Sequence, residues 1–356
     1  MKRILTLLLT VGLLLGAGAN VGAIDFKIKG QWLMGFVAGE DNLVAKNGKN
    51  IADSEDTFGA SQRLQLQMDA VASENLSGTV FIEIGKTQWG KAVAGALGAD
   101  GTNAIKLKDA YIDWRLPDTD LQFRMGIQYL ALPNKAGGSG VFDADVAGIT
   151  TSYKFNDNVE LTAIWMRPFN DNYANAKANR SNYLDNMDLF ALTLPLKFEG
   201  IETTPWVMYG MRGKNTGKFA AYQTDSLGDG LPSYTFGPYP GTIPKREISD
   251  GTSVQDIDRT GKAYGGMFWA GLPLAVTALE PFNIELDINY GHVESMGRYN
   301  AKKWKGAKDY DKKRSNTQRE GWLAKALIEY KVEWGTPGIF GWYGSGDDDN
   351  PKNGSE

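Results

Sequence analysis

The sequence predicts an all-β protein whose strands close into a transmembrane antiparallel β-barrel. Three observations lead to this fold class. About thirteen segments alternate apolar with polar residues, as strands do when their two faces meet different surroundings. The connections between these segments are alternately short and long. No run of about twenty apolar residues follows residue 23, so strands and not helices would cross a membrane.

Composition limits the classes of function. The 356-residue chain has no cysteine and one histidine, His292, which excludes disulfide frameworks, thiolate zinc sites and cysteine nucleophiles. A net charge of −4 and the lack of a basic stripe give no indication of a nucleic-acid partner. The mean hydropathy of −0.33 is too low for a membrane protein built of helices.

The N-terminal segment has the pattern of a secretory signal peptide. Lys2 and Arg3 precede the apolar run ILTLLLTVGLLLG, and small residues follow as far as Ala23. This run is too short for a good spanning helix. We therefore expect residues 1–23 to be a signal peptide and residues 24–356 to be an exported β-barrel.

The clearest strand is FNIELDINYG, residues 282–291. Its apolar residues, such as Leu286 and Ile288, alternate with acidic or amide residues such as Asp287. Successive side chains of a strand point to opposite faces, so this strand has one apolar face and one wet face. The same alternation, less regular further along the chain, predicts strands at 25–36, 63–72, 79–85, 108–116, 121–129, 149–155, 159–167, 189–198, 205–212, 263–274, 321–332 and 338–344.

Segment 321–332 has a second interpretation. Its central part, WLAKALIEY, could form one or two helical turns. Every second residue from Trp322 to Tyr330 is apolar, however, and this period of two favours a strand.

The connections indicate how the strands are arranged. The short ones, SENLS, PDTD, NDN and FEGI, contain turn residues and alternate with long polar connections rich in Gly, Asn and Asp. A soluble sandwich has no reason to keep every second connection short. A membrane barrel has short turns on its periplasmic side and long loops outside. The longest connection, residues 213–262, has room for a further pair of strands.

Aromatic residues lie at the ends of several apolar faces. We interpret these residues as girdles at the two membrane interfaces, where Trp and Tyr are enriched. They could instead cap the core of a soluble protein. They are Trp114, Tyr129, Tyr153, Trp165, Trp322 and Tyr330.

The polar faces of the strands are candidates for the wall of a water-filled pore. The predicted pore-lining residues are Arg63, Gln65, Asp69, Asp109, Asp113, Arg115, Arg124, Gln128, Lys154, Glu285 and Asp287. The third long connection, residues 131–148, carries Asp143 and Asp145. If it folds inward, these acids would face the bases of the wall and form a charged constriction. If it stays outside, it is merely a polar loop, and the residues alone leave both possibilities open.

Catalytic and metal sites are not indicated. A Ser-His-Asp site would have to use His292, which follows a strand, and the sequence has no distinctive serine motif. Carboxylate pairs such as Asp109 and Asp113 need no special role in a wet pore wall. The acidic segment GDDDN, residues 346–350, does not match the spacing of a calcium loop. We expect no enzyme, no cofactor and no bound metal.

Three segments carry a resemblance to a known family. AIDFKIKGQWLMGF, LQFRMGIQYL and PGIFGWYGSGDDDNPKNGSE together resemble the homotrimeric porins of sulfate-reducing, Desulfovibrio-type bacteria. The resemblance implies a Gram-negative outer-membrane trimer of barrels of about sixteen strands, with the third loop folded into each pore. It places Arg124 on the wall and Asp143 and Asp145 on the constriction loop. Because this chain ends on a loop after an odd number of strands, we expect it to lack the last strands.

These observations predict an outer-membrane porin. Ions and small hydrophilic solutes would diffuse passively through a water-filled pore, and the partners would be membrane lipid, solutes and two further copies of the chain. A channel selective for sugars or anions is one alternative, with Phe81 and Tyr111 as a stacking track. A secreted soluble β-protein that binds glycans is another.

Overall fold

The computed structural model describes residues 24–39, 57–90, 105–170, 186–213, 258–259, 264–295, 297–302, 312–316 and 318–345. The regular structure in these ranges consists of eighteen β-strands. No described helix is long and apolar enough to cross a membrane. The predicted all-β, antiparallel fold class is confirmed.

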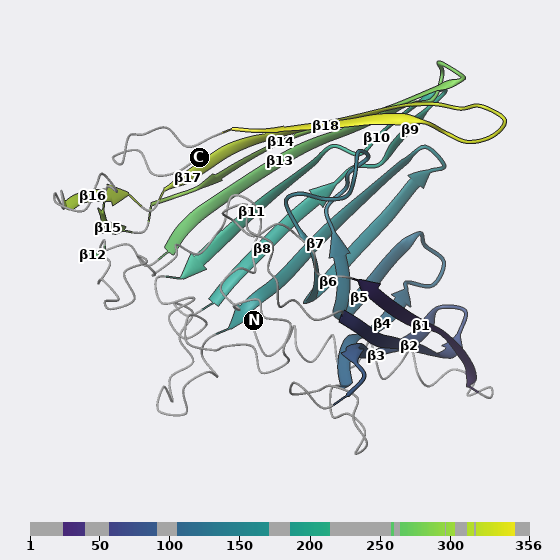
Figure 1. The fold of residues 1–356 in the computed structure, drawn as a ribbon. Coiled ribbons are helices and arrows are strands. Elements are labelled where there is room, and N and C mark those ends of the chain that lie inside the picture. The colour runs from purple at the N-terminus through teal and green to yellow at the C-terminus, as the bar shows by residue number, and fades with distance from the viewer. Residues whose placement is uncertain are drawn as a thin grey trace, which may run out of the picture. The chain divides into compact units, whose positions relative to one another are not determined.

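The chain divides into two units, which are described separately. The first unit comprises residues 1–114 and 225–230. Its strands form an antiparallel meander in which each strand pairs with the next (Figure 1). They are β1 (Asp25–Gly39), β2 (Thr57–Ser73), β3 (Leu76–Gln88) and β4 (Ile105–Arg115, of which Arg115 already belongs to the second unit).

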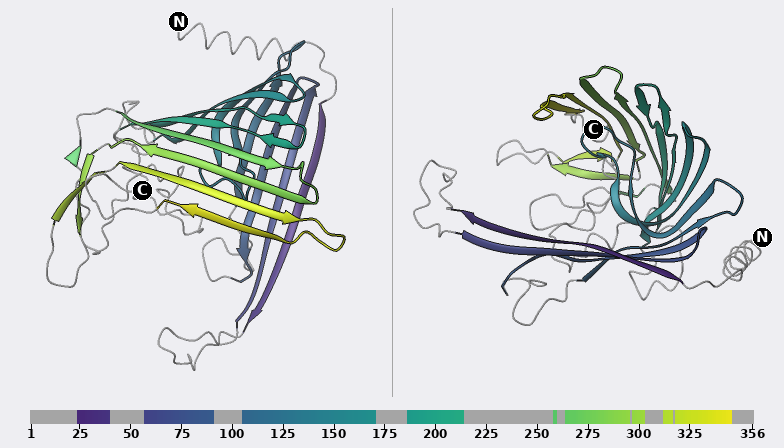
Figure 2. Two further views of the ribbon diagram at one scale, coloured as in Figure 1. Left: turned by 90° about the horizontal axis from the view of Figure 1, so that it is seen from above. Right: turned by 90° about the vertical axis from the view of Figure 1, so that its right-hand side faces the viewer.

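The second unit comprises residues 115–224 and 231–356. Its main strands, in the order in which they neighbour one another, are β5 (Leu121–Ala131), β6 (Asp143–Asn156), β7 (Val159–Asn170), β8 (Asn186–Thr193), β11 (Trp206–Gly213), β13 (Tyr264–Val276), β14 (Phe282–Val293), β17 (Arg319–Tyr330) and β18 (Gly338–Gly344). Figure 2 shows these strands side by side in a curved sheet.

Five short strands complete the second unit. The hairpin of β9 (Leu196–Phe198) and β10 (Ile201–Thr203) extends the sheet between β7 and β13. A separate antiparallel sheet contains β12 (Asp258–Arg259), β15 (Gly297–Lys302) and β16 (Lys312–Asn316).

Each predicted strand has a counterpart in the structure. Segment 321–332 is strand β17, so the strand interpretation is confirmed. Strand β6 begins at Asp143, six residues before the predicted start. Residues 1–23 and 346–350 lie outside the described residues, as does most of the connection 213–262.

The predicted alternation of short turns and long connections is also confirmed in the described part of the chain. Strands β6 and β7 are joined by two residues, whereas eleven separate β5 from β6. The backbone N–H of Asn158 donates to the side-chain oxygen of Asn156 at 2.9 Å, as amide side chains do in tight turns. Turn chemistry therefore sets the short connections.

The two faces of the sheet differ from those of a soluble protein. On β14, Leu286 and Ile288 are 38% and 51% exposed, whereas Asp287 and Asn289 are only 1% and 5% exposed. The apolar face of this strand is therefore the open one, and its polar face is covered. In water this arrangement would be the reverse of what hydrophobic burial favours.

The covered face of the second unit holds its hydrophobic core. This core lies between the strands and the connection 132–142, and it contains Leu132, Val141, Phe142, Val146, Met166, Met187, Leu189, Ala191, Trp206, Met208, Met267, Trp269 and Val293. We call this covered side the inner face and the opposite side the outer face. The inner positions of β8, β11 and β13 are apolar because the connection covers them, which explains their irregular alternation.

Candidate functional site

The connection Leu132–Phe142, here called the inner loop, folds against the inner face of the second unit. Its residues Leu132, Val141 and Phe142 are buried in the hydrophobic core. The indole N–H of Trp206, on β11, donates to the carbonyl oxygen of Pro133 at 3.0 Å. Of the two possibilities that the sequence left open for this connection, the structure has the inward fold.

Two charged side chains of the wall hold the inner loop. The carboxylate of Asp287, on β14, accepts hydrogen bonds from the backbone N–H groups of Lys135 at 3.0 Å and Ala136 at 2.5 Å. Lys325, its register partner on β17, donates from Nζ to Asn134 Oδ1 at 2.5 Å and to the carbonyl oxygen of Gly138. We call Asp287 and Lys325 the charged clamp. The Asp287 carboxylate accepts hydrogen bonds from loop N–H groups, and the Lys325 ammonium group donates to loop oxygens. These hydrogen bonds offset the cost of burying both charges.

Glycines let the inner loop lie close to the wall. Gly137 and Gly138 have φ angles of +72° and +84°, a conformation that other residues adopt only with strain. A Cβ atom at Gly140 would lie 2.5 Å from the side chain of Leu323 on β17. The sequence NKAGGSG therefore suits a tightly docked loop.

The inner loop brings a cation to the inner face. Lys135 Nζ forms an ion pair with the carboxylate of Glu202, on β10, at 2.7 Å. Both side chains are partly exposed. The polar contacts of the loop with the wall thus include Lys135 and do not depend on the acids that the sequence suggested.

Asp143 and Asp145 are not constriction-loop residues, and this prediction was wrong. Both belong to strand β6, where Asp143 pairs with Ala131 and Asp145 with Tyr129. Directly opposite residues share a face, so the two acids lie on the same face as the exposed Tyr129, whereas Arg124 lies on the inner one. The structure therefore does not bring them opposite Arg124.

The cause of this error is the core beneath the inner loop. The inner positions at the start of β6 are Ala144 and Val146, and Val146 is buried in the core. The strand is therefore apolar inside and acidic outside at this end. Ala144, Val146 and Gly148 occupy every second position, and this alternation was the signal in the sequence that would have extended the strand.

Two predicted pore-lining residues of the second unit are buried and do not line a pore. Asp287 belongs to the charged clamp. Gln128 is 1% exposed, its amide donates to the carbonyl oxygen of Gly148 at 3.2 Å, and it accepts from Thr150 Oγ1 at 2.9 Å. Both side chains hold backbone or neighbouring side chains in place.

The other predicted lining residues of the second unit are accessible. Arg115 and Lys154 are exposed, and Arg124 and Glu285 are half-buried. Lys154 Nζ lies 2.6 Å from Asp157 in the turn after β6, and this ion pair lowers the pKa of Asp157. These four residues stay candidates for the wall of a pore.

The polar face of the first unit is a ladder of side-chain hydrogen bonds. Gln65 Nε2 donates to Glu83 at 2.5 Å, and the hydroxyl of Thr79 and the amide of Gln67 each donate to Asp69 at 2.8 Å. Of the remaining predicted residues, Arg63 and Asp113 are half-buried. Asp109 is buried, so its predicted contact with pore water is not supported.

Two aromatic residues interrupt this ladder. Phe81 pairs with Asp109, and Tyr111 pairs with Thr79. Because opposite residues share a face, both rings lie among polar and charged neighbours. The ammonium group of Lys108 lies 5.7 Å from the centre of the Phe81 ring, within the range of a cation–π contact.

Three acidic residues of the inner face were missed by the sequence analysis. Glu160 is the register partner of Lys154, Glu202 lies on β10, and Glu329 lies on β17. All three are partly exposed. Glu160 and Glu329 each lie between outward-facing apolar residues, in VEL and IEY, so alternation could have identified them, whereas Glu202 lies in IET with a polar neighbour.

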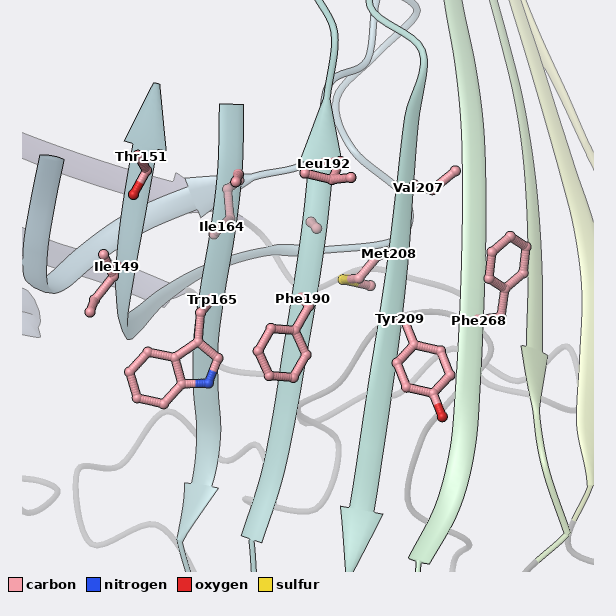
Figure 3. A pocket seen from close by; sticks show the side chains of 12 residues that line it. Ile149, Thr151, Ile164, Trp165, Phe190, Leu192, Val207, Met208, Tyr209 and Phe268 are labelled. Atoms are coloured by element: carbon pink, nitrogen blue, oxygen red, sulfur yellow. The ribbon is translucent and has the colours of Figure 1, made fainter. Parts of the chain in front are cut away.

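Aromatic residues form a row across the outer face near the long-connection ends of the strands. Trp165, Phe190, Tyr209 and Phe268 are successive register partners on β7, β8, β11 and β13. Figure 3 shows the four rings side by side at one rim of an apolar hollow of about 530 Å³. This row includes Trp165, which was predicted to belong to a girdle.

A second aromatic level lies at the short-turn ends. Phe282 and Tyr330 are in contact there, with ring centres 5.0 Å apart, and Tyr290 contacts Trp322 at the other end of the same strands, at 4.8 Å. The eight-residue step from Phe282 to Tyr290 corresponds to roughly 26 Å along a strand. Strands of a membrane barrel tilt by about 35–45°, so this step corresponds to roughly 20 Å of height, somewhat less than the apolar band about 25 Å tall between two aromatic girdles.

In the described part of the chain, no three His, Asp or Glu residues gather in a way that could hold a metal ion. His292 Nδ1 lies 3.1 Å from Glu320, and the pair occupies the outer face next to Phe268.

Comparisons with known proteins gave structural similarities only. No family model and no curated protein matches the chain. Salmonella typhi OmpF in complex with daunomycin has a TM-score of 0.45 and 11% identity, over 93% of this chain and 82% of that one. The outer membrane channel DcaP of Acinetobacter baumannii has a TM-score of 0.34 and 12% identity, over 90% and 91%. A loop-deletion mutant of OmpT, an outer membrane protein of Vibrio cholerae, has a TM-score of 0.34 and 14% identity, over 91% of this chain and 94% of that one. TM-scores below 0.5 identify neither a family nor a function.

Proposed function

We propose that this protein is a bacterial outer-membrane porin. Ions and small hydrophilic solutes diffuse through a water-filled pore that the inner loop narrows. The observation that carries the proposal is the inverted sheet of the second unit. Its outer face is apolar and exposed, and its inner face has accessible polar side chains outside the apolar part that the inner loop covers. A bilayer accounts for the first feature, and a pore accounts for the second.

The exposed apolar face is too extensive for a soluble protein. Large side chains such as Leu272, Ile288 and Ile328 are about half exposed on successive strands. Burying one such side chain contributes about 1.5–3 kcal/mol, and contiguous patches of this kind mark contacts with other apolar surfaces. The soluble glycan-binding alternative would leave this face in water. A bilayer covers it, and the sheet must then close on itself because lipid offers no partners to free backbone groups.

The accessible charged and polar side chains of the inner and polar faces are the proposed pore lining. They come from Arg63, Gln65, Asp69, Asp113, Arg115, Arg124, Lys154 and Glu285. The inner loop, with its Lys135–Glu202 ion pair, takes the place that the sequence gave to Asp143 and Asp145. Charges along a narrow water path influence which ions pass.

We also propose the finer features that the sequence resemblance implies. These are a porin of the Desulfovibrio type, a homotrimer and a barrel of about sixteen strands, and the motifs LQFRMGIQYL and PGIFGWYG support them. A cleaved signal peptide at 1–23 is proposed separately, from the basic, apolar and small-residue pattern of the N-terminal segment. Crosslinking of the detergent-extracted protein would give a band at three times the monomer mass if the chain is a trimer.

A sugar-selective channel is a second candidate function. The observation that favours it is the pair of rings Phe81 and Tyr111 among carboxylates and amides on one polar face, since sugars combine apolar ring faces with hydroxyl groups. A saturable block of ion current by an oligosaccharide, lost in Phe81→Ala, would support this candidate.

Swelling of liposomes tests the proposed function. Vesicles that contain the purified full-length protein are diluted into isotonic solutions of sugars of increasing size. A porin predicts swelling rates that fall smoothly with sugar mass. A swelling rate equal to that of protein-free vesicles, for protein shown to be folded, would contradict the proposal.

A further inference from the structure

Four glutamates lie in a row across one end of the inner face. Glu160, Glu202, Glu285 and Glu329 lie on β7, β10, β14 and β17, near the short-turn ends of these strands. Glu202 and Glu285 both pair with Ala275 of β13, which lies between them. All four side chains are partly exposed. We call them the glutamate rung.

One amide joins two members of the rung. Asn283 Nδ2 donates to Glu329 at 2.9 Å and to Glu285 at 3.2 Å. It holds two carboxylates close together, and within the described residues neither of them forms an ion pair. Like charges at this spacing repel each other, and a nearby mobile cation relieves the repulsion. Glu202 differs because Lys135 neutralises it.

The neighbouring turns strengthen the negative charge. The acidic residues of the described short connections in the second unit are Asp118, Asp120, Asp157, Glu199, Glu280 and Glu333, and the basic residues at the same end are Arg115, Lys135, Lys154, Lys197 and Lys331. Together with the rung, acids clearly outnumber bases at this end. The field at the short-turn mouth is therefore negative.

We propose that the glutamate rung makes the short-turn mouth of the pore select cations. This inference rests on the proposed function and adds the class of solute that the pore prefers, namely small cations. Two basic groups further along the inner face, Lys325 and Arg212, do not cancel the rung. Lys325 is engaged with the inner loop, and Arg212 is buried.

The selectivity should depend on salt concentration. Glu202 and Glu285 are two strands apart, which is roughly 10 Å. The screening length is about 30 Å at 0.01 M salt and about 3 Å at 1 M. In dilute salt the electrostatic fields of neighbouring glutamates therefore overlap and add, whereas in concentrated salt each glutamate is screened from the next. The preference for cations should therefore be largest in dilute salt.

Reversal potentials of the full-length protein in planar bilayers, under a KCl gradient, test the proposal. The wild type should have a ratio of cation to anion permeability above one. The double variant Glu285→Gln/Glu329→Gln keeps the shape of both side chains and should lower this ratio by about twofold or more while the channel stays open. Glu320→Gln is the matched control, because Glu320 lies on the outer face, and it should leave the ratio unchanged. If the double variant does not assemble, the single variant Glu160→Gln should lower the ratio in the same direction.

The possible failures can be told apart. An open channel that prefers anions, or one whose ratio is the same in the wild type and the double variant, would overturn the role of the rung and leave the porin proposal standing. A folded wild-type protein without any current would contradict the porin proposal, and the inference with it.

Discussion

Removal of the anionic half of the charged clamp should release the inner loop. In Asp287→Ala, the backbone N–H groups of Lys135 and Ala136 lose their acceptor, and each unsatisfied buried donor costs about 1–3 kcal/mol. Lys325 also loses the charge next to it. A total cost on the order of 3 kcal/mol shifts the equilibrium between docked and released loop by about 100-fold. The variant should therefore conduct more current per channel than the wild type.

Limited proteolysis gives an independent readout of the same release. Trypsin cleaves after lysine, and the inner loop contains one lysine, Lys135, which is paired with Glu202 and tied to the clamp through its backbone. Cleavage between Lys135 and Ala136 should be slow in the wild type and fast in Asp287→Ala. The control is Asp145→Ala, which removes an acid from the outer face and should change neither conductance nor cleavage. If Asp287→Ala conducts and resists trypsin like the wild type, the clamp does not hold the loop.

Three further changes test other parts of the account. Leu286→Arg places a charge on the outer face and should destabilise the protein in lipid by about 2–4 kcal/mol if the site lies at mid-bilayer; unchanged urea unfolding in vesicles would mean that this face does not meet lipid. Arg124→Glu reverses a charge of the inner face and should move the reversal potential toward cations, whereas an unchanged potential would remove Arg124 from the pore lining. Gly140→Leu fills the space in which the inner loop approaches Leu323, so it should displace the loop and raise conductance; a conductance equal to that of the wild type would contradict the close docking.

The strands could be predicted from the sequence wherever one face meets water and the other does not. Strand β14 is the best example, because its apolar residues, such as Leu286 and Ile288, alternate with polar ones, such as Asp287 and Asn289, from Phe282 to Tyr290. The start of β6 escaped prediction because the inner loop covers it. Burial of Val146 makes the inner face apolar at this point, and Asp143 and Asp145 make the outer face acidic, which is the reverse of the alternation expected for a membrane strand.

The site was less predictable than the strands. The sequence identified Asp287 as an inward-facing acid but gave it the wrong role, because its partners lie about 150 residues away in the chain. Only the register of β14 with β17 reveals that Lys325 completes the clamp. Glu329, in contrast, is predictable from its own strand, because it lies between the outward-facing Ile328 and Tyr330.

The most direct test of the central claim, a water-filled pore bounded by the polar faces of the strands, is single-channel recording in a planar bilayer. The full-length, detergent-extracted protein is added to one side, and the size and number of the current steps are measured. A porin predicts stable, large openings that rise with salt concentration, and a trimer predicts that they arrive in threes. Protein that is folded and inserted but passes no current would contradict the account.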